Sequence, residues 1–352
     1  MTPTQSYELN RVTEADTNAQ PSATAASLSK PQNRRPLVSV IVVVWNARKY
    51  VLECLESLRK HCQDVYTEVI VVDNCSTDGT PEMVEGFFPE FKLIRNSENY
   101  GFAKANNIGM VASSGDIICL VNSDVEFVDD CISPMLDYLS ANPSVAMVGP
   151  KMILPTGIIG RSTMRFPTIW NSICRALGLD ILFRNSRFFG GFLMSDFDHG
   201  TTRPVEVLVG WFVVARRAAI DRVGLLDPQF FMYGEDVDWC YRFHQAGEHI
   251  VFFSDAAAMH YCGASSSNAP VRFYLEMYRA NLRLWRKHRG WLGAAVFGVI
   301  LAIHQSIRIF GWAVAYVFRT SQRSSISVKV KRSVAILRWL VTYVTRTGGG
   351  IL

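Results

Sequence analysis

Three acidic segments, far apart in the chain, have the residue types of a metal and acid–base site. Asn122-Ser123-Asp124 follows a short apolar run, Asp73 follows another, and the segment from Glu235 to Asp238 holds three acids. Carboxylates bind divalent cations such as Mg²⁺ and Mn²⁺, which in turn bind phosphate oxygens, and a carboxylate can also act as a general base. Taken alone, Asn122-Ser123-Asp124 also fits an ordinary turn after a strand.

The elements that must position these acids alternate between strand and helix. Apolar runs at 38–45, 68–72, 92–95, 117–121 and 145–152 predict strands, and helical spacing predicts helices after Asn46 and Thr80 and near 102–112 and 131–141. Such alternation is typical of a mostly parallel sheet, in which ligands bind at the carboxyl ends of the strands. Neither a G-x-G-x-x-G nor a G-x-x-x-x-G-K-[ST] motif occurs, so a dehydrogenase or P-loop enzyme is disfavoured.

The second half of the chain is less regular. Residues 153–206 lack a steady period and are rich in Arg and aromatic residues, which leaves two readings open: a helical insertion with its own small core, or an acceptor-binding flap. A strand is predicted at Val207–Ala215, and helices at Arg216–Val223 and Glu235–Gln245. The strand order beyond this point does not follow from the sequence.

Five motifs, in their order along the chain, resemble the signatures of the family 2 glycosyltransferases, in particular rhamnosyltransferase-like members that build bacterial cell-surface polysaccharides. The resemblance covers residues 37–290 and implies a GT-A fold, which is a Rossmann-like, mostly parallel sheet flanked by helices. Five ordered motifs are far more specific than any one of them. They are Ser39–Asn46, Val71–Thr80, Asn99–Ala103, Asn122–Asp124 and Gly234–Trp239.

The resemblance assigns donor and metal roles. Asp73 takes the place of the aspartate that bonds the nucleotide base, and Asn122 stands where the family's D-X-D motif has its first Asp, beside the donor sugar or ribose. Asp124 keeps the charge that holds Mn²⁺ or Mg²⁺. His260 resembles the histidine that completes the metal site in some members, although a lone His is also often structural. An imidazole ligand favours Mn²⁺ somewhat.

Weaker assignments concern the neighbours of these residues. Trp45, Asn46, Lys104 and Asn107 are expected along the donor side if the helix after Gly101 is placed as in the family. Trp211 lies in a predicted strand, where it is expected either to stack on an acceptor sugar or to belong to the core.

The acids from 235 to 238 receive different roles. Asp236 matches the family's base, which takes the proton of the acceptor hydroxyl in an inverting transfer. Asp238 precedes Arg242 by four residues, so an ion pair on one helix face is expected. Glu235 is expected to orient the acceptor or to interact with the helix dipole.

The two ends of the chain have unlike compositions. Residues 1–36 are polar, without the apolar run of a signal peptide, and are expected to be disordered. Residues 272–352 hold 14 Lys or Arg and one acid, whereas the preceding 271 residues hold 22 basic and 30 acidic residues. Their apolar runs at 291–303 and 309–318 are each too short to span a bilayer. A continuous helix over 291–318 would be long enough, but Arg308 would then lie inside the bilayer, which is costly.

The tail is therefore predicted to form amphipathic helices, over 291–318 and from about Lys329 to Arg346, on an anionic membrane surface. A packing helix pair or a contact in a homo-oligomer is the alternative. A nucleic-acid partner is disfavoured, because long apolar runs interrupt the basic residues. Eight Cys without a C-x-x-C pair indicate a reducing compartment.

These features predict three parts: a disordered segment at 1–36, a GT-A domain at 37–290 and a membrane-associating tail at 291–352. The expected activity is metal-dependent, inverting transfer of a sugar, rhamnose being the first candidate, at the cytoplasmic face of the membrane. The donor would be dTDP-rhamnose, a UDP-sugar or a GDP-sugar, and the acceptor a lipid-linked glycan. The alternative is a non-catalytic sugar-nucleotide-binding or membrane scaffold protein of the same fold, which the intact acids at 73, 124 and 236 disfavour.

Overall fold

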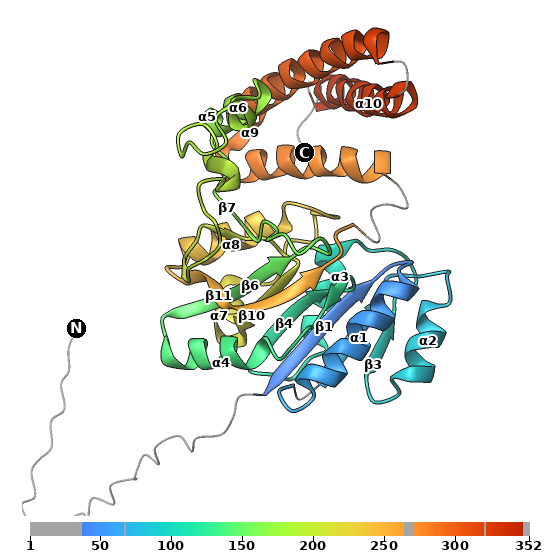
Figure 1. The fold of residues 1–352 in the computed structure, drawn as a ribbon, viewed down its shortest axis with the longest axis vertical. Helices are drawn as coiled ribbons and strands as arrows, with labels where there is room; N and C mark the ends of the chain where they lie inside the picture. Colours follow the sequence, from blue (N-terminus) through green and yellow to red (C-terminus); the bar gives the residue numbers. More distant parts are fainter. Residues whose placement is uncertain (1–36, 67, 264–269, 320–321, 348–352) are drawn as a thin grey trace, which may run out of the picture. The chain divides into compact units, whose positions relative to one another are not determined.

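A nine-stranded sheet forms the centre of the computed structural model, which describes residues 37–66, 68–263, 270–319 and 322–347. Its strand order is β3-β2-β1-β4-β10-β6-β11-β5, and β8 pairs with β11 (Figure 1). The predicted disorder of 1–36 lies outside the described residues. The strands of this sheet are β1 (Val38–Val44), β2 (Glu68–Asp73), β3 (Lys92–Arg95), β4 (Ile117–Asn122), β5 (Val125–Glu126), β6 (Val145–Ile153), β8 (Arg203–Pro204), β10 (Phe212–Arg216) and β11 (His249–His260).

The sheet is mostly parallel, as the alternation of elements predicts. β1 pairs in parallel with β2 and β4, and β6 pairs in parallel with β11. β10 runs antiparallel between β4 and β6, and β5 and β8 run antiparallel to β11. The prediction of a single strand at Val207–Ala215 is wrong, because the segment forms two strands. The first, β9 (Val207–Leu208), pairs with β7 (Thr163–Met164) in a second sheet, and the second is β10.

Helices cover both faces of the sheet because β1 carries buried apolar side chains on both of its sides. Val40 and Val42 pack with the helices of one face, and Ile41 packs with those of the other. On the first face lie α1 (Arg48–Cys62), α2 (Thr80–Phe87) and α4 (Ile132–Ala141); on the second lie α3 (Phe102–Val111), α7 (Arg217–Val223) and α8 (Glu235–Gln245).

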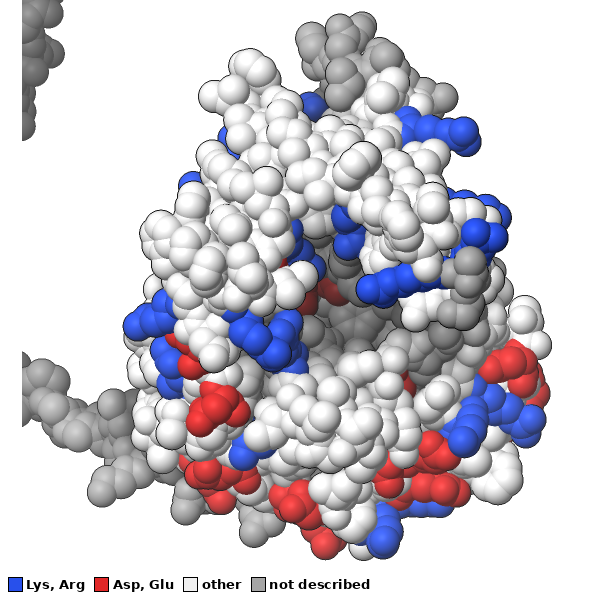
Figure 2. Space-filling view, turned by 45° about the horizontal axis from the view of Figure 1, so that its top comes forward, with Lys and Arg blue, Asp and Glu red and all other residues white. Residues whose placement is uncertain are grey.

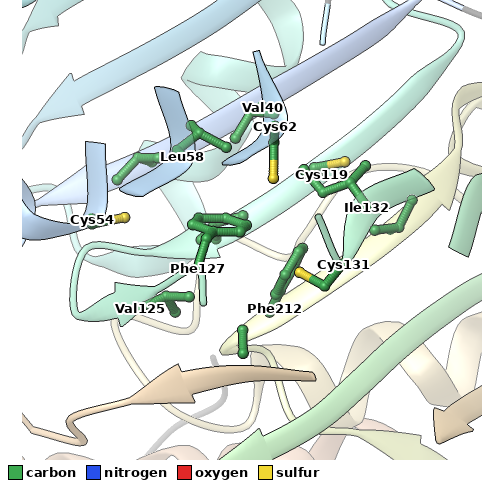
Figure 3. Close-up of a cluster of buried hydrophobic side chains, with 14 of the residues drawn as sticks. Val40, Cys54, Leu58, Cys62, Cys119, Val125, Phe127, Cys131, Ile132 and Phe212 are labelled. Carbon is green, nitrogen blue, oxygen red and sulfur yellow. The ribbon is translucent and has the colours of Figure 1, made fainter. Parts of the chain in front are cut away.

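Figure 3 shows part of the first core, in which four cysteines behave as small apolar side chains: Cys54, Cys62, Cys119 and Cys131. All four are free thiols. Burial and nearby acids raise the pKa of Cys62 to about 12, so this thiol is unreactive at neutral pH.

The segment 153–206 contains short elements: α5 (Ile169–Ala176), α6 (Leu179–Leu182) and the 3₁₀ turn η1 (Gly191–Leu193). We call residues 161–193 the insertion. α5 packs against the C-terminal helix α9, and a Trp170–Phe188–Phe189 aromatic cluster holds the insertion together. Trp170 and Phe188 are 40% and 63% exposed, so this cluster lies at the surface, while α5 of the insertion borders α9.

The C-terminal helices are longer than predicted. α9 (Pro270–Phe318) is interrupted at Gly290, whose φ is 67°, and α10 (Arg323–Thr347) follows. Ala280 and Leu284, before the break, belong to the core of the second sheet face. Among the described residues, α9 is long and apolar enough to cross a membrane, and about a quarter of its most apolar window (28%) is buried.

Candidate active site

The predicted donor residues emerge at one edge of the sheet. Asp73 pairs with Val44, and Asn122 pairs with Val43. Since β2, β1 and β4 are adjacent, two strand spacings place the Asp73 and Asn122 backbones about 10 Å apart at the same edge. Loops after parallel strands thus bring segments separated by 49 positions in the sequence to one side.

Asp124 and His260 form a direct contact at this edge. His260 ends β11 and pairs with Val125 of β5, which places its Nε2 3.0 Å from Asp124 Oδ1. The amide nitrogen of Asn122 lies 3.4 Å from the same Nε2. Burial opposes the charge on His260, but hydrogen bonds to Asp124 and Cys262 outweigh it and raise the pKa of the imidazole to about 9.

The donor chemistry of this pair fits a divalent cation. Asp124 offers carboxylate oxygen, His260 offers imidazole nitrogen once a cation displaces its proton, and the buried Oδ1 of Asn122 has no hydrogen-bond partner among the described residues. The part of the chain that the structure describes contains no group of three or more His, Cys, Asp or Glu placed to bind one metal ion. A Mn²⁺ or Mg²⁺ ion held here would therefore complete its shell with substrate phosphate and water, as is usual for such ions.

Asp236 lines the same cavity as Asp124 and His260, and its carboxyl group accepts hydrogen bonds from two backbone N–H groups. Gly210 N donates to its Oδ2 at 3.1 Å, and Val237 N donates to its Oδ1 at 2.8 Å. Burial raises the pKa of the Asp236 carboxyl, and these N–H groups oppose that rise. A carboxyl with fixed orientation and raised basicity suits a general base.

The neighbouring acids differ in environment. Glu235 is 5% exposed, its Oε2 has no partner among the described residues, and burial together with Asp236 raises its pKa well above the usual value. Asp238 is fully buried and accepts from Arg242 Nε at 2.9 Å, as its spacing predicts. Lys287 and His288 of α9 also contact it, at 2.7 and 2.8 Å.

A cavity of about 550 Å³ unites these groups, a size typical of a small-molecule site. Figure 2 shows the hollow, with Lys and Arg side chains beside its opening and acidic atoms inside it. The predicted site residues in its wall are Asn122, Asp124, Trp211, Glu235, Asp236 and His260. Trp211 is 2% exposed and stacks on His260 with 5.2 Å between ring centroids, so it positions the imidazole.

Four other predicted donor residues lie outside the cavity wall: two in the loop after β1, one at the end of β2 and one on α3. Asp73 is buried; its Oδ2 accepts from Ser76 N, and its Oδ1 has no partner among the described residues. Asn46 accepts from Thr77 N at 2.8 Å, Trp45 contacts Phe273, and Lys104 lies 3.6 Å above the Tyr100 ring.

Asn107 does not reach the donor edge. Its amide donates to Leu226 O at 2.7 Å and accepts from Leu226 N at 3.1 Å, which uses both ends of the side chain. Asn107 therefore joins α3 to the segment after α7. The assignment of Asn107 to the donor side rested on the helix face, which does not show what packs against that face.

Two contributors to the site do not follow from residue type. Gly210 acts through its backbone N–H on Asp236, and Cys262 Sγ lies 3.2 Å from His260 Nδ1. A Gly inside an apolar strand pattern is a known sign of an irregularity, and Val209-Gly210-Trp211 is where the predicted strand breaks.

Known proteins resemble this chain in sequence and in fold. Residues 39–200 match the model for glycosyl transferase family 2. N-acetylglucosaminyl-diphospho-decaprenol L-rhamnosyltransferase of Mycobacterium tuberculosis is 27% identical over 267 residues, covering 72% of this chain and 86% of that protein. Glycosyltransferase AglE of Haloferax volcanii is 26% identical over 256 residues, covering 71% and 72%.

Solved structures show the fold. The mannosyltransferase PcManGT from Pyrobaculum calidifontis, in complex with GDP-Man and Mn²⁺, superposes with a TM-score of 0.51 at 17% identity, covering 87% of this chain and 88% of that one. GalNAc-T7 with UDP, GalNAc and Mn²⁺ gives 0.51 at 16% identity, covering 73% and 49%. The fold is GT-A, and the chain is similar to glycosyl transferase family 2 over the segment that the family model matches.

Proposed function

We propose that the protein catalyses inverting transfer of a sugar from a nucleoside diphosphate to a hydroxyl of a lipid-linked glycan. One observation supports this above the others: Asp236 and the Asp124–His260 pair lie in the wall of one cavity. A single displacement at an anomeric carbon needs these two functions, a base for the acceptor and a site for the departing diphosphate.

In the proposed donor complex the nucleotide lies along the carboxyl edge of β2, β1 and β4. The unpartnered Oδ1 of Asp73 accepts the ring N–H of the base, and the Asn122 amide bonds the ribose or sugar. Asp124 and His260 hold Mn²⁺ or Mg²⁺ against the diphosphate. The cation, when bound, stabilises the negative charge that the leaving nucleoside diphosphate gains.

On the acceptor side, Asp236 takes the hydroxyl proton while the acceptor oxygen forms the new bond to the anomeric carbon. The bond from that carbon to the diphosphate oxygen breaks, and the nucleoside diphosphate leaves. The backbone N–H groups of Gly210 and Val237 keep the carboxyl aimed during this step. Glu235 supports the acceptor beside it.

We assign dTDP-rhamnose as the donor and a lipid-linked glycan as the acceptor, because the relative from Mycobacterium tuberculosis is named for a rhamnosyl transfer to N-acetylglucosaminyl-diphospho-decaprenol. UDP- and GDP-sugars are the alternative donors. The transfer reaction would take place at the cytoplasmic face of the membrane, with α9 and α10 against an anionic lipid surface. Exposed apolar side chains along α9, among them Trp291, Phe310 and Phe318, support this location.

Two measurements test the function. A panel of nucleotide sugars with Mn²⁺ should show one that raises the Tm, since a ligand that binds only the native state stabilises it. Radiolabelled transfer to a lipid-linked acceptor should follow with that donor and stop in EDTA. Tm protection without turnover would instead support a non-catalytic sugar-nucleotide-binding protein.

A further inference from the structure

The cavity that contains Asp236 continues into a part that the proposed reaction does not use. Its far wall comes from α5 of the insertion and from α9 on both sides of Gly290. Trp285 before the break stacks on Phe297 after it, with 5.4 Å between ring centroids and planes 9° apart. The two parts of α9 and the insertion therefore enclose one space.

This far wall is mainly apolar where α9 forms it. Phe297, Ile300 and Leu301 line the cavity. The same stretch of α9 also carries exposed apolar side chains, with Val299 60% and Ile303 48% exposed. This stretch of α9 is therefore apolar on the side that lines the cavity and on the side that faces solvent. Such a helix suits a ligand with a membrane-embedded apolar part.

Positive charge also lines this cavity. Arg161 and Arg175 line the cavity and are exposed, and neither forms an ion pair within the described part of the chain. By contrast, Arg165 and Arg187 of the same insertion both lie near Asp196. The Arg175 guanidinium lies 5.6 Å from the Phe192 ring centre, a contact that leaves its N–H edge available to an anion.

His304 adds a polar group at the same place. It lines the cavity near Arg175, and its buried Nε2 has no hydrogen-bond partner among the described residues. A buried polar atom without a partner is costly, so a ligand that bonds it is favoured. The two guanidinium groups match the oxygens and the charge of a diphosphate, whereas His304, whose pKa burial and Arg308 lower to about 4, is neutral.

We propose that this part of the cavity binds the isoprenoid diphosphate of the acceptor, an inference that rests on the proposed function for its direction. The sugar of the acceptor points to Asp236, its phosphates lie beside Arg161 and Arg175, and its hydrocarbon chain follows Phe297, Ile300 and Leu301. A longer polar glycan does not fit as well, because the α9 wall offers it few hydrogen bonds.

Binding of farnesyl diphosphate to the full chain tests the site without any sugar transfer. The titration is done by calorimetry in EDTA, so that no cation at Asp124 and His260 recruits the diphosphate. We expect farnesyl diphosphate to bind at least tenfold more tightly than either inorganic diphosphate or farnesol. The double variant Arg161→Ala/Arg175→Ala should weaken its binding at least tenfold, and Ile300→Asn should also weaken it.

Arg184→Ala is the matched control, because Arg184 is an exposed arginine of the same insertion outside the cavity wall. It should bind farnesyl diphosphate as the unaltered chain does. Equal affinity of the double variant and the control, with both folded by circular dichroism, would overturn the site. Tm protection by nucleotide sugars in the same preparations reports separately on the proposed function, so failure of one is distinguishable from failure of the other.

Discussion

Asp236 and Glu235 are adjacent in sequence and are stabilised differently. Asp236 accepts two backbone N–H groups, whereas Glu235 Oε2 has no partner among the described residues. The fold thus tolerates one ionised carboxylate here and favours the protonated form of the other. The sequence predicted that Asp236 and Glu235 belong to the site, but burial set the difference between them.

Glu235→Gln should stabilise the protein above pH 4.5, its ordinary pKa. In the folded state its pKa is raised, so the unfolded chain ionises first as pH rises and folding stability is lost. Glutamine is neutral at all pH values and avoids this loss. The Tm difference between variant and parent should be small at pH 5 and larger at pH 8. Glu56→Gln, at an exposed position on α1, should show no such change.

Asp238→Asn should destabilise the fold by about 3–5 kcal/mol in urea unfolding at pH 7, since it removes the charge that Arg242, Lys287 and His288 share in a buried site. Burial opposes ionisation, but hydrogen bonds from His288 and Lys287 lower the pKa of Asp238. Its contribution is therefore present above pH 3.8 and fades as pH falls below it. Glu53→Gln, which breaks an exposed pair with Lys49, should cost less than about 1 kcal/mol. A similar loss in both variants would contradict the role of Asp238.

At the scale of elements, the backbone at Gly101, just before α3, lies very close to the backbone of Phe231. Gly101 has φ 81°, and a Cβ built there would lie 2.2 Å from Phe231 O, which itself accepts from Phe102 N. Only glycine combines that dihedral with such a contact. The Asn99-Tyr100-Gly101 motif therefore fastens α3 to the segment that leads into α8 and Asp236.

Gly101→Ala should cost about 2 kcal/mol or more, by strain and by displacement of the Phe231 loop. The control is Gly86→Ala in α2, where a Cβ would meet nothing within 4 Å and helix propensity should improve by up to about 1 kcal/mol. Urea unfolding measures both. Equal free energies of unfolding for the two variants would contradict this prediction and show that the Phe231 loop adapts to the added methyl group.

The sequence predicted local elements well and long-range packing poorly. β3 and α8 begin and end where periodicity places them, because apolar spacing and the Gly234 turn are local signals. The antiparallel β10 between β4 and β6 was not predicted, since strand order depends on packing across the sheet. The roles of Gly210 and Asn107 likewise arise from contacts with partners 26 and 119 residues away.

At the scale of the whole molecule, the C-terminal helices join the catalytic domain to an apolar exposed surface. Lys287 and His288 reach Asp238, and residues further along α9 line the cavity. The predicted boundary at residue 290 coincides with the break at Gly290, yet both sides of it border the cavity. The sequence of the tail predicted membrane association, but it could not show that α9 forms part of the cavity wall.

Replacing Val299, Phe310 and Val317 by Ser should reduce sedimentation of the full chain with anionic liposomes at least tenfold, because these exposed apolar side chains belong to the proposed membrane-contacting surface. Serine at Phe87, Val111 and Val128, which are exposed on the catalytic domain, should leave sedimentation unchanged. Equal loss in both triple variants would argue against a specific membrane face on α9.

The central claim is that Asp236 is the base of a transferase site whose donor is held elsewhere. Asp236→Asn keeps the side-chain shape and removes the basic oxygen, so transfer should fall about 10³-fold. Donor binding, measured as Tm protection by the nucleotide sugar with Mn²⁺, should stay within about threefold of the parent in affinity, because the proposed donor contacts are at Asp73, Asn122 and Asp124. Near-parental transfer, or loss of donor binding together with transfer, would contradict the account.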